Sequence, residues 1–258
     1  MHVIETLGVS KEFRSAGILA VDNASIAVDE GDFVSLLGPS GCGKSTLLHL
    51  LAGLAMPSSG SVTYRGERVT RPLTTIGVAF QDSYLLDWRS VRDNVLLQFD
   101  MRGAGRRDRR SHIASADRLL SEVGLAGFGD KHVWELSGGM KQRVALCRTL
   151  IHEPEVLLLD EPFGALDMLT RDQLNLDLSR LAHERQVTTV LVTHSIAEAV
   201  FLSRRVLVMS PRPGRIVAEV QVELPTPREL PMRRAQAYAD GVDAVYRIFQ
   251  NLGVLHGA

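Results

Sequence analysis

The chain carries Gly38-Pro39-Ser40-Gly41-Cys42-Gly43-Lys44-Ser45 between two apolar runs, residues 33–37 and 47–52. This order is typical of a strand, a glycine-rich turn and a helix. Glycines let the backbone curl so that its N–H groups surround phosphate oxygens, and the helix start adds the positive end of its dipole. Lys44 can then reach the β- and γ-phosphates of a nucleotide, and Ser45 can ligate Mg²⁺. The stretch predicts a nucleotide site; a surface turn before a core helix is the alternative.

The composition indicates a folded protein with one large core, or a core with a small lobe, because 45% of its 258 residues are hydrophobic. The formal charge of −1 gives no overall attraction to nucleic acid, so we expect no nucleic-acid partner. We interpret the basic run as a solvated loop or helix face; it comprises Arg102, Arg106, Arg107, Arg109 and Arg110. Neither a membrane-spanning segment nor an export signal is expected, which favours the cytosol.

The chain has two cysteines, Cys42 and Cys147, and their spacing argues against disulfides and zinc. Cys147 is interpreted as a small core residue. Cys42 lies at a helix start beside Lys44, and both features would lower the pKa of its thiol. We therefore expect a thiol alkylator to inactivate the protein and bound nucleotide to slow this reaction.

Alternating strand and helix patterns predict an α/β fold. Short β-branched runs at residues 3–9, 33–37, 75–80, 156–159 and 189–193 alternate with helical patterns, which indicates parallel strands around one nucleotide-binding core. Between residues 87 and 139 strand signals disappear, which predicts an inserted helical lobe. Its apolar residues at helical spacing are Ile113, Ala116, Leu119, Leu120 and Val123.

The last third of the chain has a different pattern. Residues 205–209 and 214–220 are predicted to pair as strands around the turn Pro211-Arg212-Pro213-Gly214. From Met232 onward a helix is predicted to pack on the core. Its apolar face comprises Tyr238, Val242, Val245, Phe249 and Leu252.

Two carboxylates, Asp160 and Glu161, follow the apolar run 156–159. A fully buried strand that ends in acids indicates a cation or a proton-transfer role nearby. Asp160 would hold Mg²⁺, directly or through water, and Glu161 would polarise the water that attacks a γ-phosphate. Taken alone, the pair could be a solvated strand end; together with the glycine-rich loop it predicts nucleotide hydrolysis.

A second anion site is predicted at residues 136–142, which read Leu-Ser-Gly-Gly-Met-Lys-Gln. Ser137, Gly138 and Gly139 stand at the exposed N-terminus of a predicted helix. One bound nucleotide does not need two separate phosphate-binding sites, unless the second site binds a nucleotide that is held by another subunit. Here the chain resembles the ATP-binding cassette (ABC) ATPases, whose signature motif is similar to LSGGQ and whose two copies sandwich two ATP molecules head to tail.

The resemblance covers nearly the whole chain and implies the ABC form of the P-loop NTPase fold: a parallel RecA-like core, an antiparallel β subdomain and an inserted α-helical subdomain. The implied division gives residues 1–86 and 155–222 to the core with the β subdomain. Residues 87–154 form the helical subdomain with the signature motif, and residues 223–258 form a C-terminal extension.

The resemblance also implies roles for individual residues. Gln81 resembles the glutamine that touches Mg²⁺ and water, His194 the switch histidine that contacts the γ-phosphate, and Ala165-Leu166-Asp167 the D-loop. Phe13 resembles the aromatic residue that stacks on adenine, although a core phenylalanine is the alternative. The implied ATP-binding residues are Phe13, Gly38, Pro39, Ser40, Gly41, Cys42, Gly43, Lys44, Ser45, Thr46, Ser137, Gly138 and Gly139. Ser45, Gln81 and Asp160 would hold Mg²⁺, and Lys44, Gln81, Glu161 and His194 would act in catalysis.

Some positions depart from the commonest family pattern. Ser195 follows His194 where relatives often have Asp, but residues 195–198 still predict a capping box for the next helix. Met140 and Lys141 replace other common choices without touching Ser137 or Gly139.

A single cassette with a short extension resembles the ATPases of prokaryotic importers. This implies a homodimer at the cytoplasmic side of the membrane, two permease subunits and, indirectly, a periplasmic or extracellular solute-binding protein. Residues 81–88 and 209–216 resemble the branch for nitrate, sulfonate and taurine, although Asp87 stands where proline is frequent. Tyr84, Leu85, Leu86 and Trp88 are the predicted permease dock, with packing on the helical lobe as the alternative.

Three alternatives to this assignment stay open. The solute can be another small organic molecule of the same importer branch. The chain can be a cassette of nucleic-acid maintenance or translation, although such relatives usually carry coiled coils or two cassettes. It can also be a nucleotide-binding module without catalysis.

Overall fold

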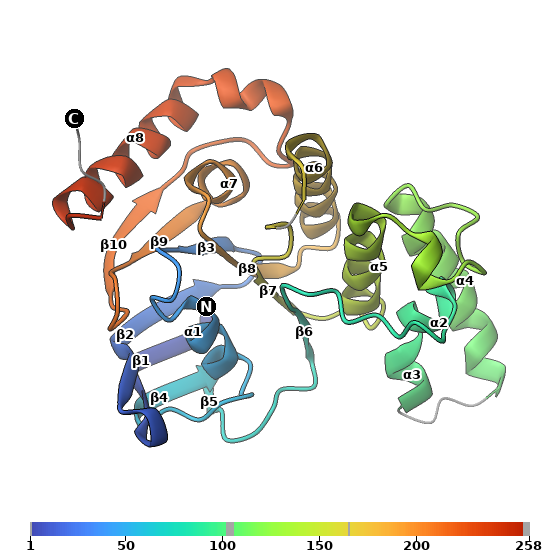
Figure 1. Cartoon of the computed structure of the whole chain (residues 1–258), viewed down its shortest axis with the longest axis horizontal. Helices are drawn as coiled ribbons and strands as arrows, with labels where there is room; N and C mark the ends of the chain where they lie inside the picture. Colours follow the sequence, from blue (N-terminus) through green and yellow to red (C-terminus); the bar gives the residue numbers. More distant parts are fainter. Residues whose placement is uncertain (1, 102–105, 165, 255–258) are drawn as a thin grey trace.

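The computed structural model describes residues 2–101, 106–164 and 166–254, and it contains two sheets (Figure 1). The larger sheet has the strand order β10-β9-β3-β8-β7-β6. Strands β3, β6, β7, β8 and β9 run parallel, and β10 pairs antiparallel with β9 at one edge. Their bounds are β3 Phe33–Leu37, β6 Ile76–Ala79, β7 Val156–Asp160, β8 Thr188–Thr193, β9 Arg205–Met209 and β10 Ile216–Gln221. Strands β7 and β8 are buried along their whole length, as continuous apolar runs in a covered parallel sheet require. The parallel sheet and the β9–β10 pair are thus confirmed.

The smaller sheet is antiparallel and has the order β2-β1-β4-β5. Its strands are β1 His2–Phe13, β2 Ile18–Asp29, β4 Ser59–Tyr64 and β5 Glu67–Arg68. The run 3–9 was predicted among the parallel strands, and this was wrong because β1 pairs antiparallel with both β2 and β4. The connection from β1 to β2 is only the turn η1 Arg14–Ala16 with Gly17, and a link this short permits antiparallel pairing alone.

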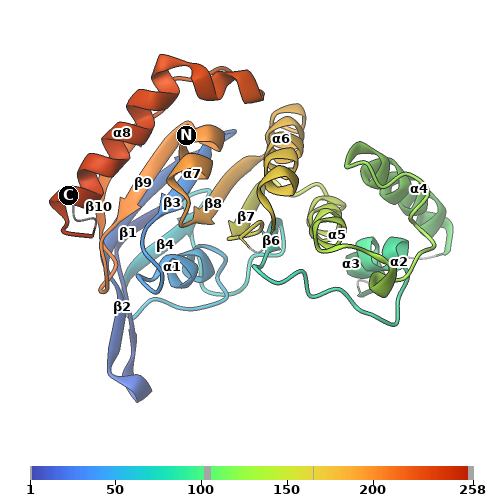
Figure 2. The same cartoon turned by 45° about the horizontal axis from the view of Figure 1, so that its top comes forward.

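Helices fill the space between and around the sheets. Helix α1 Lys44–Leu51 packs between β1 and β2 on one side and β7 and β8 on the other, and its leucines are buried. Helices α6 Met168–Glu184 and α7 Ile196–Leu202 lie on the other side of the parallel sheet (Figures 1 and 2). The predicted C-terminal helix is confirmed: after η3 Leu230–Arg234, helix α8 Gln236–Asn251 buries Val245 and Phe249 against α7 and β10.

The remaining helices extend to one side of the molecule (Figure 2). They are α2 Val91–Val95, α3 Leu97–Met101, α4 Arg106–Glu122, η2 Val133–Glu135 and α5 Gly138–Leu150. The apolar residues predicted at helical spacing lie in or against one core cluster, which also contains Val144 and Leu150 of α5; all but Val123 belong to α4. Of the basic run, Arg110 is exposed, whereas Arg102 and the side chains of residues 106–109 lie outside the described residues. The exact division into subdomains stays a prediction.

None of the helices in the described ranges is long and apolar enough to cross a membrane.

Candidate nucleotide site

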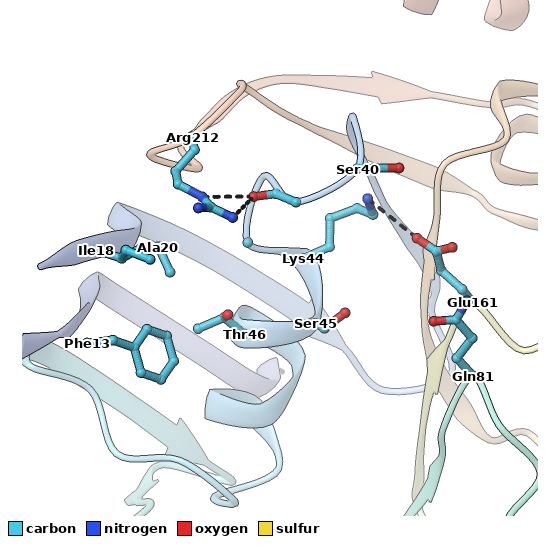
Figure 3. A pocket seen from close by; sticks show the side chains of 12 residues that line it. Phe13, Ile18, Ala20, Ser40, Lys44, Ser45, Thr46, Gln81, Glu161 and Arg212 are labelled. Carbon is cyan, nitrogen blue, oxygen red and sulfur yellow. Dashed lines mark hydrogen bonds and ion pairs between the residues drawn. The ribbon is translucent and has the colours of Figure 1, made fainter. Parts of the chain in front are cut away.

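An open pocket lies where the loop between β3 and α1 faces the carboxyl end of β7 (Figure 3). Its volume of about 480 Å³ is in the range of small-molecule sites. The lining residues come from distant parts of the chain: Phe13, Ile18, Ala20, Ser40, Gly41, Gly43, Lys44, Ser45, Thr46, Gln81, Glu161 and Arg212. The fold therefore brings the predicted loop, Phe13, Gln81 and Glu161 to one cavity.

The loop from residue 38 to residue 43 depends on glycine. Gly41 and Gly43 have φ angles of 72° and 113°, in the region that favours glycine. A Cβ atom on Gly43 would lie 2.4 Å from the carbonyl oxygen of Ala20. The loop can therefore press against β2 while it curls around the start of α1, which is the geometry of an anion cradle.

Lys44 points back across this loop. Its Nζ donates to the carbonyl oxygens of Gly38 at 2.9 Å and Pro39 at 3.1 Å, and lies 3.6 Å from Oε1 of Glu161. The residue is only 5% exposed. A buried ammonium group held at the pocket wall attracts an anionic ligand.

Asp160 ends β7 beside the start of α1. Ser45 Oγ donates to Asp160 Oδ1 at 2.9 Å. Burial raises the pKa of the Asp160 carboxyl above its usual value, although the bond from Ser45 acts in the opposite direction. A hydroxyl, a carboxylate and the nearby Gln81 amide are oxygen donors of the kind that Mg²⁺ prefers. In the described part of the chain, no three or more His, Cys, Asp or Glu side chains come together as a group that could hold a metal ion.

Glu161 is held in an uncommon conformation next to Asp160. Its φ angle is 44°, and its backbone N–H donates to the carbonyl oxygen of Val192 on β8 at 2.9 Å. Its Oε2 lies 2.8 Å from Nδ1 of His194, the residue that follows β8. Lys44 and His194 thus flank the two oxygens of one carboxylate, so the group is fixed in position and open to a water molecule in the pocket.

Ser137, Gly138 and Gly139 lie outside this pocket. Ser137 caps α5 by accepting a bond of 3.4 Å from the N–H of Met140. A Cβ atom on Gly139 would lie 2.5 Å from Cγ2 of Thr170, so the start of α5 packs closely on α6. The helix start predicted at Ser137 is confirmed and lies outside the pocket of its own chain, and anion binding there stays a prediction.

A family model described as ABC transporter matches residues 21–164. The chain belongs to the ABC transporter family. Among its ABC relatives, the taurine import ATP-binding protein TauB of Ruegeria pomeroyi is 45% identical over 209 residues, which are 81% of this chain and 77% of TauB. The nitrate import ATP-binding protein NrtC of Synechococcus elongatus is 45% identical over 226 residues, which are 86% of this chain and 34% of NrtC. The uncharacterised ABC transporter ATP-binding protein MJ0412 of Methanocaldococcus jannaschii is 43% identical over 88% of this chain and 84% of MJ0412.

Solved ABC cassettes have the same architecture. The dimeric, post-hydrolysis cassette MJ0796 bound to ADP and Pi superposes with a TM-score of 0.73 at 29% identity, over 86% of this chain and 99% of the other. CbiO1 from Clostridium perfringens gives a TM-score of 0.77 over 98% of this chain and 99% of its own, but its 24% identity supports the fold alone. The predicted ABC ATPase fold is confirmed, and the chain is an ATP-binding ATPase of this family.

Phe13 lies on the pocket wall of this ABC cassette. The side chain is 43% exposed, so the alternative of a core phenylalanine is wrong. Lys11 Nζ lies 5.4 Å from the centre of its ring. Stacking of Phe13 on adenine stays a prediction.

The expected reactivity of Cys42 is wrong. Cys42 is 1% exposed, and its side chain turns into the core beneath the loop, away from the pocket. Burial raises the pKa of its thiol and outweighs the opposing effect of Lys44. Cys147 is fully buried as expected, and burial raises the pKa of its thiol as well.

The predicted capping box after His194 is only half formed. Ser195 Oγ accepts a bond of 3.3 Å from the N–H of Glu198, as expected. The Glu198 carboxylate does not return to the helix start, because it accepts instead from the buried hydroxyl of Thr193. This bond ties α7 to the end of β8, so His194 still follows a fixed strand end.

Three arginines near the site had no predicted role. Arg148 of α5 donates to the carbonyl oxygens of Ser83 at 2.6 Å and Tyr84 at 2.8 Å. Arg171 of α6 donates to the carbonyl oxygen of Leu166 at 2.8 Å, whereas Ala165 of the predicted D-loop lies outside the described residues. Arg212 reaches the phosphate loop from the turn between β9 and β10. Only Arg212 had a sequence signal, since it lies in a turn rich in proline and glycine.

Proposed function

We propose that this chain is the ATP-hydrolysing subunit of an importer for a small anion, and that ATP binds in the pocket beside Lys44. The observation that carries the proposal is the Glu161 carboxylate, held between His194 Nδ1 at 2.8 Å and Lys44 Nζ at 3.6 Å. A carboxylate fixed at the end of a phosphate pocket fits the task of orienting an attacking water.

The residues around the pocket have separate roles in ATP binding and hydrolysis. Phe13 stacks on adenine, the loop amides bind the phosphates, and Lys44 neutralises the β- and γ-phosphate oxygens. Ser45, Asp160 and Gln81 would hold Mg²⁺, which would supply further charge neutralisation. Glu161 accepts a proton from the attacking water, while His194 keeps its carboxylate oriented and contacts the γ-phosphate.

The catalytic site is completed by a second copy of the chain. Ser137, Gly138 and Gly139 start α5 outside their own chain's pocket; Ser137 and Gly138 are exposed there and available to the γ-phosphate bound by a partner, whereas Gly139 is buried against α6. The cassette MJ0796 bound to ADP and Pi is described as dimeric, which supports this arrangement. ATP binding would close the two chains together, and hydrolysis would let them separate.

A permease would supply the transport path. Tyr84 and Trp88 are 65% and 75% exposed in the segment that follows Gln81, and they form the proposed dock. The cassette would then sit at the cytoplasmic face of the membrane, with a solute-binding protein acting through the permease. Relatives named for taurine and nitrate import make these two solutes the first to test.

The test is deletion of the gene in its host, followed by uptake of isotope-labelled taurine, nitrate and bicarbonate. Bicarbonate is included because a relative, CmpC of Synechocystis, is named for its transport. We expect uptake of one of these anions to fall to background and to be restored by the parent gene but not by Glu161→Gln. Unchanged uptake of all three anions would reject the proposed solute class. ATP hydrolysis by the purified chain would still test the proposed catalytic roles.

A further inference from the structure

Arg212 reaches from the turn between β9 and β10 to the phosphate loop (Figure 3). Its Nε and Nη2 donate to the carbonyl oxygen of Gly41 at 3.0 Å and 2.8 Å. The side chain also lines the pocket that contains Phe13 and Lys44. The guanidinium group is therefore fixed at the pocket wall by one backbone atom.

Most of the hydrogen-bonding capacity of Arg212 is unused. A guanidinium has five N–H donors, and the bonds to Gly41 occupy two of them. Within the described ranges of the chain, Arg212 has no other hydrogen-bond acceptor and no carboxylate within ion-pair distance. A charged group in this state favours an anionic ligand.

The turn that carries Arg212 is held tightly. Gly214 donates to the carbonyl oxygen of Ala20 at 3.0 Å and accepts from the N–H of Asp22 at 2.9 Å. A Cβ atom on Gly214 would lie 2.2 Å from the carbonyl oxygen of Cys42, so the turn packs closely against the phosphate loop as well as against β2. The position of Arg212 is thus set before any ligand binds.

We propose that Arg212 is an additional ATP-binding residue, which contacts the phosphate chain of the nucleotide from the Gly41 side of the pocket. A guanidinium binds phosphate oxygens through several parallel N–H groups and keeps its charge at any physiological pH. The ammonium group of Lys44 is buried and already contacts Gly38, Pro39 and Glu161. Arg212 therefore adds a second cation whose donors are free. The inference rests on the proposed placement of ATP in this pocket.

The competing explanation is that Arg212 only braces the loop through Gly41. Three substitutions separate the two roles in the full-length chain. Arg212→Gln keeps an N–H donor for the Gly41 carbonyl but removes the charge, Arg212→Lys keeps the charge, and Arg212→Ala removes both. The matched control is Arg215→Gln, because Arg215 lies on the same turn and pairs with Asp22 outside the pocket.

The measurement is the dissociation constant of ATP and of ADP by calorimetry, at low salt and at about 0.5 M salt. We expect Arg212→Gln and Arg212→Ala to weaken both nucleotides about tenfold at low salt, and Arg212→Lys to recover most of the loss. The difference between the parent and Arg212→Gln should shrink at high salt, because a charge contact is screened. Arg215→Gln should bind like the parent.

Parent affinity in Arg212→Gln would overturn the proposal and leave Arg212 as a loop brace. Equal losses in Arg212→Gln and Arg215→Gln would also overturn it, since the turn and not the guanidinium would then matter. Lys44→Ala serves as the benchmark for ATP placement. If Lys44→Ala also bound ATP normally, the proposed site itself would be wrong, which is a different failure.

Discussion

His194 Nδ1 lies 2.8 Å from Oε2 of Glu161, across the ends of two neighbouring parallel strands. This contact orients the carboxylate, and the contact proposed between His194 and the γ-phosphate is only one of many, since the loop amides, Lys44 and Phe13 would hold most of the nucleotide. His194→Ala should therefore lower the ATPase rate about 100-fold and leave the dissociation constant of ATP within about threefold of the parent value. Steady-state hydrolysis and calorimetry measure the two effects. An equal loss of affinity and rate would show that His194 supports binding and not positioning.

Asp160 carries a buried carboxylate whose pKa is raised by desolvation. At low pH the group is protonated in both the folded and the unfolded chain, so Asp160→Asn and the parent should have the same Tm. As the pH rises through the raised folded-state pKa, only the parent must bury a charge, and its stability falls relative to the variant. At neutral pH, without nucleotide or Mg²⁺, Asp160→Asn should therefore melt about 2 °C or more above the parent.

The same Asp160→Asn variant should lose the effect of Mg²⁺ on ATP affinity. Calorimetric titration of ATP with and without Mg²⁺ checks this. A variant that melts below the parent at neutral pH, or that keeps the full Mg²⁺ effect, would contradict the proposed role of Asp160.

Gly43 and Gly66 form a matched pair for the phosphate loop. Both have positive φ angles, 113° and 82°, but a Cβ atom would meet Ala20 O at 2.4 Å on Gly43 and nothing within 4 Å on Gly66. Gly66→Ala should lower Tm by about 2–4 °C through backbone strain alone and keep ATP binding. Gly43→Ala should lower Tm by at least about 6 °C and abolish ATP binding, because the loop must leave β2. Similar effects of both substitutions would contradict the claim that the close contact between Gly43 and Ala20 is needed for ATP binding.

Arg148 holds the segment that follows Gln81. Its guanidinium bonds to the carbonyl oxygens of Ser83 and Tyr84, and burial lowers its pKa. Arg148→Ala should cost about 2 kcal/mol in the free energy of unfolding and increase hydrogen exchange in residues 82–88. Gln142→Ala is the control, because among the described residues the Gln142 side chain makes a single, exposed bond of 3.1 Å, to the Gln81 carbonyl. Unchanged exchange in Arg148→Ala would mean that other contacts order this segment.

Much of the site was predictable because it lies at strand ends whose motifs are local in sequence. The loop at Gly38–Ser45 and the pair Asp160 and Glu161 each follow an apolar run, and parallel strands place such ends at one edge of a sheet. The contact between His194 and Glu161 could be expected only through the family resemblance, since 33 positions separate the two residues.

The incorrect predictions, and the residue that was missed, depend on tertiary packing, which the local sequence does not show. Cys42 has the sequence neighbours of a reactive thiol, but its side chain enters the core, and desolvation reverses the expected direction of the pKa shift. Strand β1 has the same β-branched pattern as the parallel strands, but it pairs antiparallel with β2, as their short link requires, and with β4. Arg212 was missed because 171 positions separate it from Gly41.

Glu161→Gln tests the central claim most directly, since it removes the proposed base and keeps the shape of the side chain. ATP turnover and molecular mass by light scattering are measured on the same sample with saturating Mg-ATP. The rate should fall at least about 100-fold, and ATP should convert the variant to a stable particle of twice the chain mass. Hydrolysis at the parent rate would contradict the assignment of Glu161 and the account of catalysis built on it.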